Sequence, residues 1–253
     1  MIKNWPNPPD NGRVKTVNQM GFMFVQLSTL SQRFIEYATQ STSPVIDIGC
    51  AYGVAVLPIL DAESTCPVVA LDTCQTHLDE LLDRVPDNKK TQITTIRATF
   101  PEEFSFPDNY FQAIHIAYVL QFFKGEQLKA GLIKCFNSLK PGGKLFLYTA
   151  SIYFNFWRDQ FLSQYEKKSA AGVEFPGEIE NQHQYLPAQF DEAKQVLPIF
   201  THVFKLDDLV KIVSSTGFKV EVAEYDDIQG VSGYESEGKG MISIVAEKPA
   251  FRL

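Results

Sequence analysis

Two acidic residues and a turn containing glycine, in the first third of the chain, have the spacing of a ligand-binding loop. Asp47 ends an apolar run, and a second apolar run ends in Asp72. Between them the chain turns through Gly49, Ala51 and Gly53 into a helix-like segment. A strand, a glycine turn, a helix and a second strand tipped by an acid can hold a ribose and the group attached to it. The glycines let the backbone approach a ligand because they lack a Cβ atom, and the second acid can accept both hydroxyl protons of a ribose.

The same residues argue against a dinucleotide as the ligand. A dinucleotide-binding loop has the pattern Gly-x-Gly-x-x-Gly, with backbone N–H groups at the helix start facing a pyrophosphate. Counted from Gly49, the second glycine position holds Ala51 and the third holds Val54. The carboxylate of Asp47 would repel a phosphate, whereas it suits an ammonium group. A ligand with a ribose at one end and an amino acid at the other fits both acids, and S-adenosylmethionine is such a ligand.

At this loop the chain resembles the class I S-adenosylmethionine-dependent methyltransferases. Their first motif is usually acid-x-Gly-x-Gly-x-Gly, and it is matched here by Asp47, Gly49 and Gly53. Ala51 stands where the middle glycine is usual, which we interpret as a small loss of room. The order and spacing of the later matches strengthen this resemblance.

The resemblance covers residues 43–149 and, more loosely, residues 205–248. Its most specific later part is Leu-Lys-Pro-Gly-Gly at 139–143, placed before an apolar strand. The chain departs from the family at Thr99, where many members have an aspartate, so a threonine hydroxyl or a backbone N–H would contact the adenine instead. Gln112 likewise replaces an acid before the fourth strand.

The resemblance implies which residues surround the cofactor. Asp47 would face its amino-acid end, Asp72 would bind its ribose, and the small Ala117 would leave room for the methyl group. Phe100 would stack on the adenine or pack in the core, and the glycines could serve only as turn and helix-packing residues. The predicted cofactor-binding residues are Asp47, Gly49, Cys50, Ala51, Gly53, Asp72, Thr73, Thr99, Phe100 and Ala117.

Apolar runs of strand length alternate with helical patterns, which predicts a doubly wound α/β fold with a parallel sheet. In the family the last strand is antiparallel and lies between the fifth and sixth. We therefore expect a seven-stranded, mostly parallel sheet with an antiparallel last strand and helices on both faces. The expected strands are 45–48, 68–71, 93–98, 114–117, 144–149, 218–225 and 241–247. The expected helices are 53–60, 75–82, 126–139 and 206–215.

The segments outside the core are expected to shape the site. Apolar residues spaced by three and four predict a helix over 17–40. In similar proteins an N-terminal helix covers the cofactor, so Phe22, Phe24 and Tyr37 are candidates for lining it. The expected division is 1–42 as lead-in, helix and candidate cap, 43–150 as cofactor-binding core, 151–204 as cap insertion, and 205–253 as the rest of the sheet.

The expected insertion, residues 151–204, is dense in aromatic side chains. These side chains could form a small folding core or wall a pocket for an apolar or aromatic substrate, and we expect a lid that does both. Its two histidines, His183 and His202, could take a proton from a hydroxyl or amine acceptor. Tyr118 at the tip of the fourth strand could contact cofactor or substrate. These three residues are the catalytic candidates, and ordinary packing is the alternative for each.

Composition limits the partners of the protein. Its 253 residues have a formal net charge of −7 and no Lys/Arg run, which argues against a nucleic-acid partner. The four cysteines have no Cys-x-x-Cys spacing, so we expect free thiols and no metal site. No apolar run is long enough to span a bilayer, and the first residues do not read as a secretory leader. We therefore expect a cytoplasmic protein, whose oligomeric state the sequence does not indicate.

These features favour an S-adenosylmethionine-dependent methyltransferase that acts on a small, apolar or aromatic acceptor by in-line transfer from the sulfonium. A protein methyltransferase is one alternative, and it would need a groove open to a peptide. A non-catalytic interaction protein with the same fold is another. The missing third glycine disfavours a nicotinamide oxidoreductase. The sequence Ala-Tyr-Val-Leu at 117–120 lacks the Asn/Asp-Pro-Pro-Tyr pattern of amino methylation of adenine or glutamine.

Overall fold

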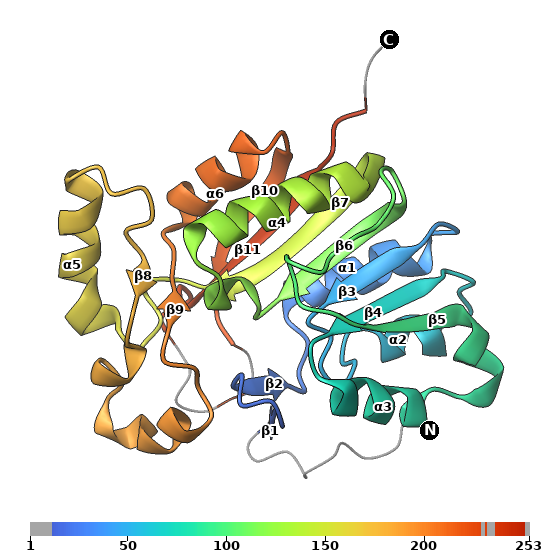
Figure 1. The fold of residues 1–253 in the computed structure, drawn as a ribbon, viewed down its shortest axis with the longest axis horizontal. Helices are drawn as coiled ribbons and strands as arrows, with labels where there is room; N and C mark the ends of the chain where they lie inside the picture. Colours follow the sequence, from blue (N-terminus) through green and yellow to red (C-terminus); the bar gives the residue numbers. More distant parts are fainter. Residues whose placement is uncertain (1–11, 229–230, 232–235, 251–253) are drawn as a thin grey trace.

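A seven-stranded sheet forms the centre of the protein (Figure 1). The structure is a computed structural model that describes residues 12–228, 231 and 236–250, so most of the predicted irregular lead-in lies outside the described residues. The strand order across the sheet is β10-β11-β7-β6-β3-β4-β5. The strands are β3 (Val45–Ile48), β4 (Val68–Asp72), β5 (Ile93–Arg97), β6 (Phe111–Ala117), β7 (Leu139–Ala150), β10 (Lys219–Asp226) and β11 (Met241–Glu247).

The strand directions confirm the predicted sheet. Strands β5, β4, β3, β6 and β7 pair in parallel, whereas β11 is antiparallel to both β7 and β10. The residues described between β10 and β11 form no helix, and an antiparallel pairing needs no crossover helix. The last strand therefore lies between the fifth and the sixth of the sheet, as expected.

Helices cover both faces of this sheet. All residues of β3 and β4 are buried, which is why parallel strands appear in the sequence as continuous apolar runs. One face packs against α1 (Thr29–Thr39), α2 (Leu57–Asp61) and α3 (Gln75–Arg84), and the other against α4 (Gly125–Ser138) and α6 (Leu206–Ser215). Among the described residues, no helix has both the length and the apolar character of a membrane span.

The predicted helix over 17–40 is wrong in its first half. The chain there forms a hairpin of β1 (Arg13–Lys15) and β2 (Phe22–Phe24), and α1 begins only at Thr29. Gln19 has a φ of 58° and Gly21 a φ of 98°, values that a right-handed helix does not contain. Ser28 then caps α1, because its side chain accepts a hydrogen bond from the Ser31 N–H.

The Pro-Gly-Gly segment before the fifth core strand is a bulge rather than a loop outside it. Strand β7 already begins at Leu139, and its register against β6 jumps from Phe111↔Leu139 to Ala113↔Lys144. The extra residues bend the strand while the sheet continues on both sides of them. A turn signal in the sequence therefore marks a bulge in this strand.

The elements of residues 151–204, the segment expected to be an insertion, lie beside the sheet (Figure 1), and most of their buried apolar side chains belong to the same hydrophobic core as α1, α2 and α3. A backbone hydrogen bond of 2.8 Å from the Gly21 N–H to the Val196 carbonyl joins the β1–β2 hairpin to this insertion. The elements of the insertion are α5 (Arg158–Ala170), β8 (Glu178–Ile179), the 3-10 helices Gln182–Gln184 and Ala188–Gln195, and β9 (Thr201–His202).

Candidate active site

A cavity of about 350 Å³, the first cavity, lies at the carboxyl ends of β3, β4 and β6. Strand β3 lies between β4 and β6, so the chain reverses its direction across the sheet at this point. Open α/β sheets bind ligands in this position. The predicted cofactor-binding residues that line the first cavity are Asp47, Gly49, Cys50, Ala51, Asp72, Thr73, Thr99, Phe100 and Ala117.

Gly53 is the predicted cofactor residue that does not line the first cavity. Its φ is 84°, and a Cβ atom added there would lie 2.3 Å from Cδ1 of Leu81 on α3. Gly53 therefore serves the packing of the loop against the helix, which was the alternative reading of this glycine.

The loop between β3 and α2 has two left-handed residues at the cavity wall. Gly49 has a φ of 74°, and a Cβ atom there would lie 2.3 Å from Cγ2 of Val119. Ala51 has a φ of 44°, a conformation that costs an L-residue with a Cβ roughly 1–2 kcal/mol. The alanine at the usual glycine position therefore strains the backbone, which is more than the small loss of room expected from the sequence.

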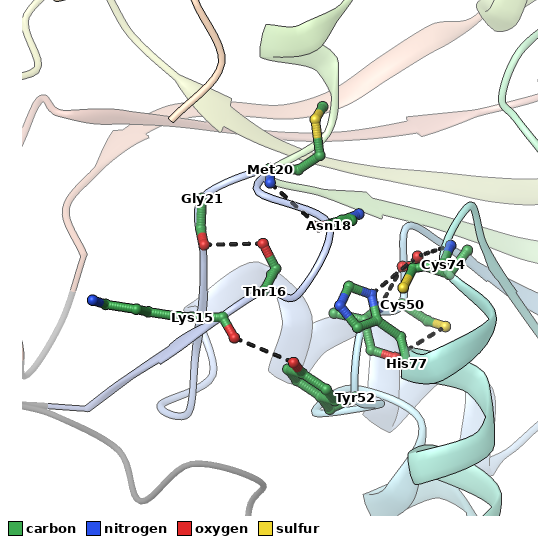
Figure 2. Close-up of polar contacts among 11 residues, drawn as sticks. Lys15, Thr16, Asn18, Met20, Gly21, Cys50, Tyr52, Cys74 and His77 are labelled. Carbon is green, nitrogen blue, oxygen red and sulfur yellow. Dashed lines mark hydrogen bonds and ion pairs between the residues drawn. The ribbon is translucent and has the colours of Figure 1, made fainter. Parts of the chain in front are cut away.

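Asp72 holds this loop from the end of β4, where its partners Cys74 and His77 lie close to each other (Figure 2). Its Oδ2 accepts the Ala51 N–H at 2.9 Å, and its Oδ1 accepts the Cys74 N–H at 2.8 Å and lies 3.1 Å from Nδ1 of His77. A carboxylate has about four acceptor positions. One position on Oδ2 is left for a ligand hydroxyl, so the carboxylate has room for one ribose hydroxyl rather than two.

His77 lines the first cavity and is not among the predicted site residues. It lies in the first turn of α3, which brings its ring back over Asp72, and only 1% of its surface is exposed. Its Nε2 is buried and has no hydrogen-bond partner in the described part of the chain. The signal in the sequence was its position five residues after the strand-end acid, at the start of a helix.

Asp47 has a histidine partner from the neighbouring strand. Its Oδ1 lies 2.7 Å from Nδ1 of His115. Asp47 and His115 face each other in the register of β3 and β6. Nε2 of His115 lies 3.0 Å from Oγ of Ser31, and Ser31 Oγ lies 3.0 Å from Oγ of Ser28. All four side chains line the first cavity.

A smaller cavity of about 80 Å³, the second cavity, adjoins the first. The two share walls formed by Met20, Phe22, Phe24, Tyr118 and Phe122. None of the described residues that line the second cavity carries a formal charge. Its remaining lining residues are Gly21, Gln121, Ala150, Phe154, Phe156, Trp157, Gln182, Leu197, Thr201, Ile228 and Met241.

Tyr118 is the catalytic candidate that lies between the two cavities. Its φ is 59°, and its ring packs against Phe24 and Tyr148 with centroid distances of 5.0 and 5.1 Å. Burial and, secondly, the nearby Asp226 carboxylate raise the pKa of the Tyr118 phenol well above its ordinary value. The phenol is therefore protonated at neutral pH, so it can donate a hydrogen bond but does not act as a base.

The two histidine candidates line neither cavity. Nε2 of His183 lies 3.0 Å from the Leu197 carbonyl, and Nδ1 of His202 lies 3.1 Å from the Phe123 carbonyl. Burial lowers the pKa of His202 to about 4. This geometry gives neither histidine contact with a ligand in these cavities.

The other residues predicted to line the cofactor site also differ in whether they line the first cavity. Phe22 and Phe24 line the first cavity, whereas Tyr37 does not and instead accepts a hydrogen bond from Gln112 Nε2 at 2.7 Å. The Thr99 N–H donates to Oε2 of Glu103 at 2.7 Å, and the Thr99 side chain also hydrogen-bonds Glu103. The ring of Phe100 lines the cavity and packs against Phe104 and Phe123.

Comparison with known proteins identifies the kind of domain in which this cavity lies. Residues 45–143 match the family model of the methyltransferase domain. The glycopeptide N-methyltransferase MtfA, complexed with S-adenosyl-L-methionine, has a similar structure at a TM-score of 0.57 and 16% identity, covering 87% of this chain and 92% of that one. Residues 45–143 are therefore a methyltransferase domain, and the chain has the fold of S-adenosylmethionine-dependent methyltransferases.

Two further structures show how widely this methyltransferase fold is shared. A methyltransferase from Methanosarcina mazei has a TM-score of 0.63 at 15% identity, over 89% of this chain and all (100%) of that one. Geranyl diphosphate methyltransferase, in complex with GPP and sinefungin, has a TM-score of 0.57 at 11% identity, over 86% and 77%. Identities this low establish the fold alone. No curated protein sequence matches this methyltransferase.

The first cavity of this methyltransferase fits its cofactor, S-adenosylmethionine. The part of its wall that the structure describes holds the carboxylates of Asp47, Asp72 and Glu102 and no lysine or arginine, which suits a ligand with an ammonium and a sulfonium group. The absent Cβ of Gly49 keeps the loop close to β6, and Asp72 Oδ2 keeps one acceptor position for a hydroxyl.

Proposed function

We propose that this methyltransferase acts on a small molecule that binds in the second cavity. The observation that carries this proposal is the uncharged, largely aromatic wall of that cavity and its shared boundary with the first. Aromatic walls with few polar groups bind apolar or aromatic ligands, and they also bind an organic cation through their ring faces.

Within the first cavity we assign the cofactor's parts to the residues that could hold them. The free position on Asp72 Oδ2 accepts a ribose hydroxyl, and the Asp47 carboxylate faces the ammonium end. Thr73, Thr99 and Phe100 bound the adenine side. Ala117 leaves room where the two cavities approach each other.

When bound, S-adenosylmethionine supplies a methyl group that is already electrophilic because it is attached to a sulfonium. The chain then has two tasks, which are to hold the acceptor in line with that group and to exclude water. Positioning of this kind lowers a barrier by roughly 7–11 kcal/mol in favourable cases. The shared wall formed by Phe22, Phe24 and Tyr118 serves both tasks, since each side chain lines both cavities.

Tyr118 is the residue of this wall that can orient a polar atom of the acceptor. Its backbone is fixed, because Gln121 Nε2 donates to the Tyr118 carbonyl at 2.8 Å and Gln121 Oε1 accepts from Thr149 Oγ1 at 3.2 Å. The raised pKa of its phenol keeps the hydroxyl protonated. Tyr118 therefore donates a hydrogen bond to a polar atom of the methyl-accepting substrate. Because Tyr118 does not act as a base, the substrate atom that is methylated must reach the site with its lone pair free.

A peptide is the second candidate methyl acceptor, and the geometry of the second cavity disfavours it. Its wall combines the β1–β2 hairpin with the insertion, which the Gly21–Val196 hydrogen bond joins beside the cavity. A side chain on a long peptide would have to enter between these joined segments. A small molecule needs no such opening.

Calorimetric titration with S-adenosylhomocysteine, with NAD as the control ligand, tests the cofactor cavity first. A screen of small neutral and cationic acceptors, read out by mass spectrometry of the methylated product, then tests the second cavity. Trp157→Phe should raise the KM for an active acceptor about tenfold and leave S-adenosylhomocysteine affinity unchanged. Tyr110→Phe, at a 39% exposed aromatic residue that lines neither cavity, is the matched control. Methylation of peptides but of no small acceptor would overturn the proposal.

A further inference from the structure

A chain of buried hydrogen bonds runs from the first cavity to the start of α1. It passes from Asp47 on β3 to His115 on β6, and from there to Ser31 and Ser28. The four side chains are 5% exposed or less. The ring of His115 also stacks on Phe34 of α1, with centroids 4.6 Å apart and an interplanar angle of 10°. The imidazole is thus fixed both by its two nitrogens and by its face.

The donor and acceptor groups determine the direction in which each of these hydrogen bonds is donated. An ionised carboxylate only accepts, so Nδ1 of His115 carries the proton that is donated to Asp47. In the neutral imidazole Nε2 is then an acceptor, and Ser31 Oγ donates to it. Ser28 Oγ accepts from the Ser31 N–H at 3.0 Å and can donate to Ser31 Oγ. With this tautomer every link has a donor and an acceptor.

We propose that His115 is a positioning residue that fixes the Asp47 carboxylate for the ammonium end of the cofactor and connects it through Ser31 to the N-cap of α1. A lysine or arginine partner would satisfy Asp47 but would also cancel its charge. A neutral histidine satisfies one carboxylate oxygen and leaves that charge available to the ligand. This role rests on the cofactor use and on the placement of Asp47 given above.

The connection to α1 also affects the cavity, because the segment before this helix forms part of the cavity wall. Segment 22–28, which leads into the N-cap, contributes Phe22, Phe24, Gln26 and Leu27 to the wall of the first cavity. Ser28 itself caps the helix and ends the hydrogen-bonded chain. The position of the cavity wall and the orientation of Asp47 are therefore set by one set of contacts.

Two ligands separate this role from a merely structural one. S-adenosylhomocysteine has the nucleoside and the amino-acid end, whereas 5′-methylthioadenosine has only the nucleoside end. A hydrogen bond to a charged group contributes roughly 1.5–3 kcal/mol. His115→Ala should therefore weaken S-adenosylhomocysteine binding about 10-fold to 100-fold and leave 5′-methylthioadenosine binding within about twofold.

Two milder variants keep the test valid if His115→Ala does not fold. His115→Asn places an amide N–H near the position of Nδ1 and should restore most of the S-adenosylhomocysteine affinity. Ser31→Ala removes only the second link and should weaken that ligand about threefold to tenfold. His77→Ala is the matched control, because it removes the histidine beside the other acid and should weaken both ligands together.

The ratio of the two affinities, measured by calorimetry with a melting curve for each variant, decides the outcome. An equal loss of both ligands in the His115 and Ser31 variants would show a structural role only, and unchanged affinities would remove the role altogether. No methyl acceptor is present in these titrations. Their result is therefore independent of whether the proposed small-molecule acceptor is found.

Discussion

Two buried carboxylates end neighbouring parallel strands, and each has a histidine partner, but the two pairs are built from different parts of the chain. His77 lies five residues after Asp72, and that acid also holds two backbone N–H groups of its own loops. His115 lies 68 residues after Asp47 and continues into α1. The first pair therefore shapes a local loop, whereas the second joins the sheet to the N-terminal segment.

A third buried histidine shows what the carboxylates contribute. His202 is 1% exposed and faces a backbone carbonyl instead of an acid. A carbonyl offers no net charge to stabilise an imidazolium, so burial dominates and the pKa falls to about 4. The three histidines thus occupy similarly buried places with different electrostatic surroundings.

The largest effect is expected for Asp72→Ala. This change removes the acceptor of the Ala51 and Cys74 N–H groups and of His77, and each unsatisfied buried group costs roughly 1–3 kcal/mol. We expect a stability loss of several kcal/mol and at least about a 100-fold weaker binding of both nucleoside ligands. Melting curves and calorimetry measure the two effects, with Asp72→Asn as the control that keeps the shape. Unchanged binding of both ligands would show that the ribose site lies elsewhere.

The next largest effect is the pH dependence of the free energy of unfolding that we expect from His202. Its folded-state pKa of about 4 lies below the ordinary value of roughly 6.5, so the unfolded state takes up the proton first. Its contribution is fully present above pH ~6.5 and is lost toward pH ~4, by up to about 3 kcal/mol. Urea unfolding across this range should show the loss, and His202→Phe should flatten that part of the profile. An identical slope in the variant would rule out His202 as its source.

Asp47→Asn sharpens the contrast between the two pairs. The amide oxygen still accepts from His115, so the fold should be kept while the charge for the ammonium group is lost. We expect S-adenosylhomocysteine affinity to fall about 10-fold to 100-fold, with 5′-methylthioadenosine within about twofold. The same loss for both ligands would place Asp47 with Asp72 at the nucleoside end.

The smallest effect is expected for Ala51→Gly, which changes the loop that Asp72 holds. Glycine adopts the φ of 44° without strain, although it also raises the entropy of the unfolded chain. We expect a net gain of about 0.5–1 kcal/mol, measured by urea unfolding, with little change in ligand affinity. A loss of stability would mean that the alanine methyl group contributes packing that outweighs the strain. Gly142→Ala, at another left-handed residue with open space around it, should instead destabilise the protein.

The sheet could be predicted from the sequence because its signals are local. Continuous apolar runs mark the buried parallel strands, and the strand-end acid and the glycines mark the loop beside them. The start of the N-terminal helix could not be predicted in this way. The apolar spacing of residues 17–28 also fits a hairpin in which Gln19 and Gly21 turn the chain.

The histidine partners of the two acids also differ in how far the sequence alone could predict them, because one contact is local and the other is not. His77 stood close to Asp72 in the sequence, and its helical position could have indicated the contact. His115 could be found only from the register of β3 against β6, which the sequence of either strand does not contain. The link to Ser31 required in addition the true start of α1.

The shared wall of the two cavities has a thermodynamic consequence. Phe22, Phe24 and Tyr118 belong to both, so a ligand that orders these side chains from one side changes their freedom on the other. Cofactor and acceptor binding are then coupled, and the factor by which one changes the affinity of the other must be equal in both directions. An acceptor would therefore report its presence as cooperativity in cofactor binding, even before any methyl group is transferred.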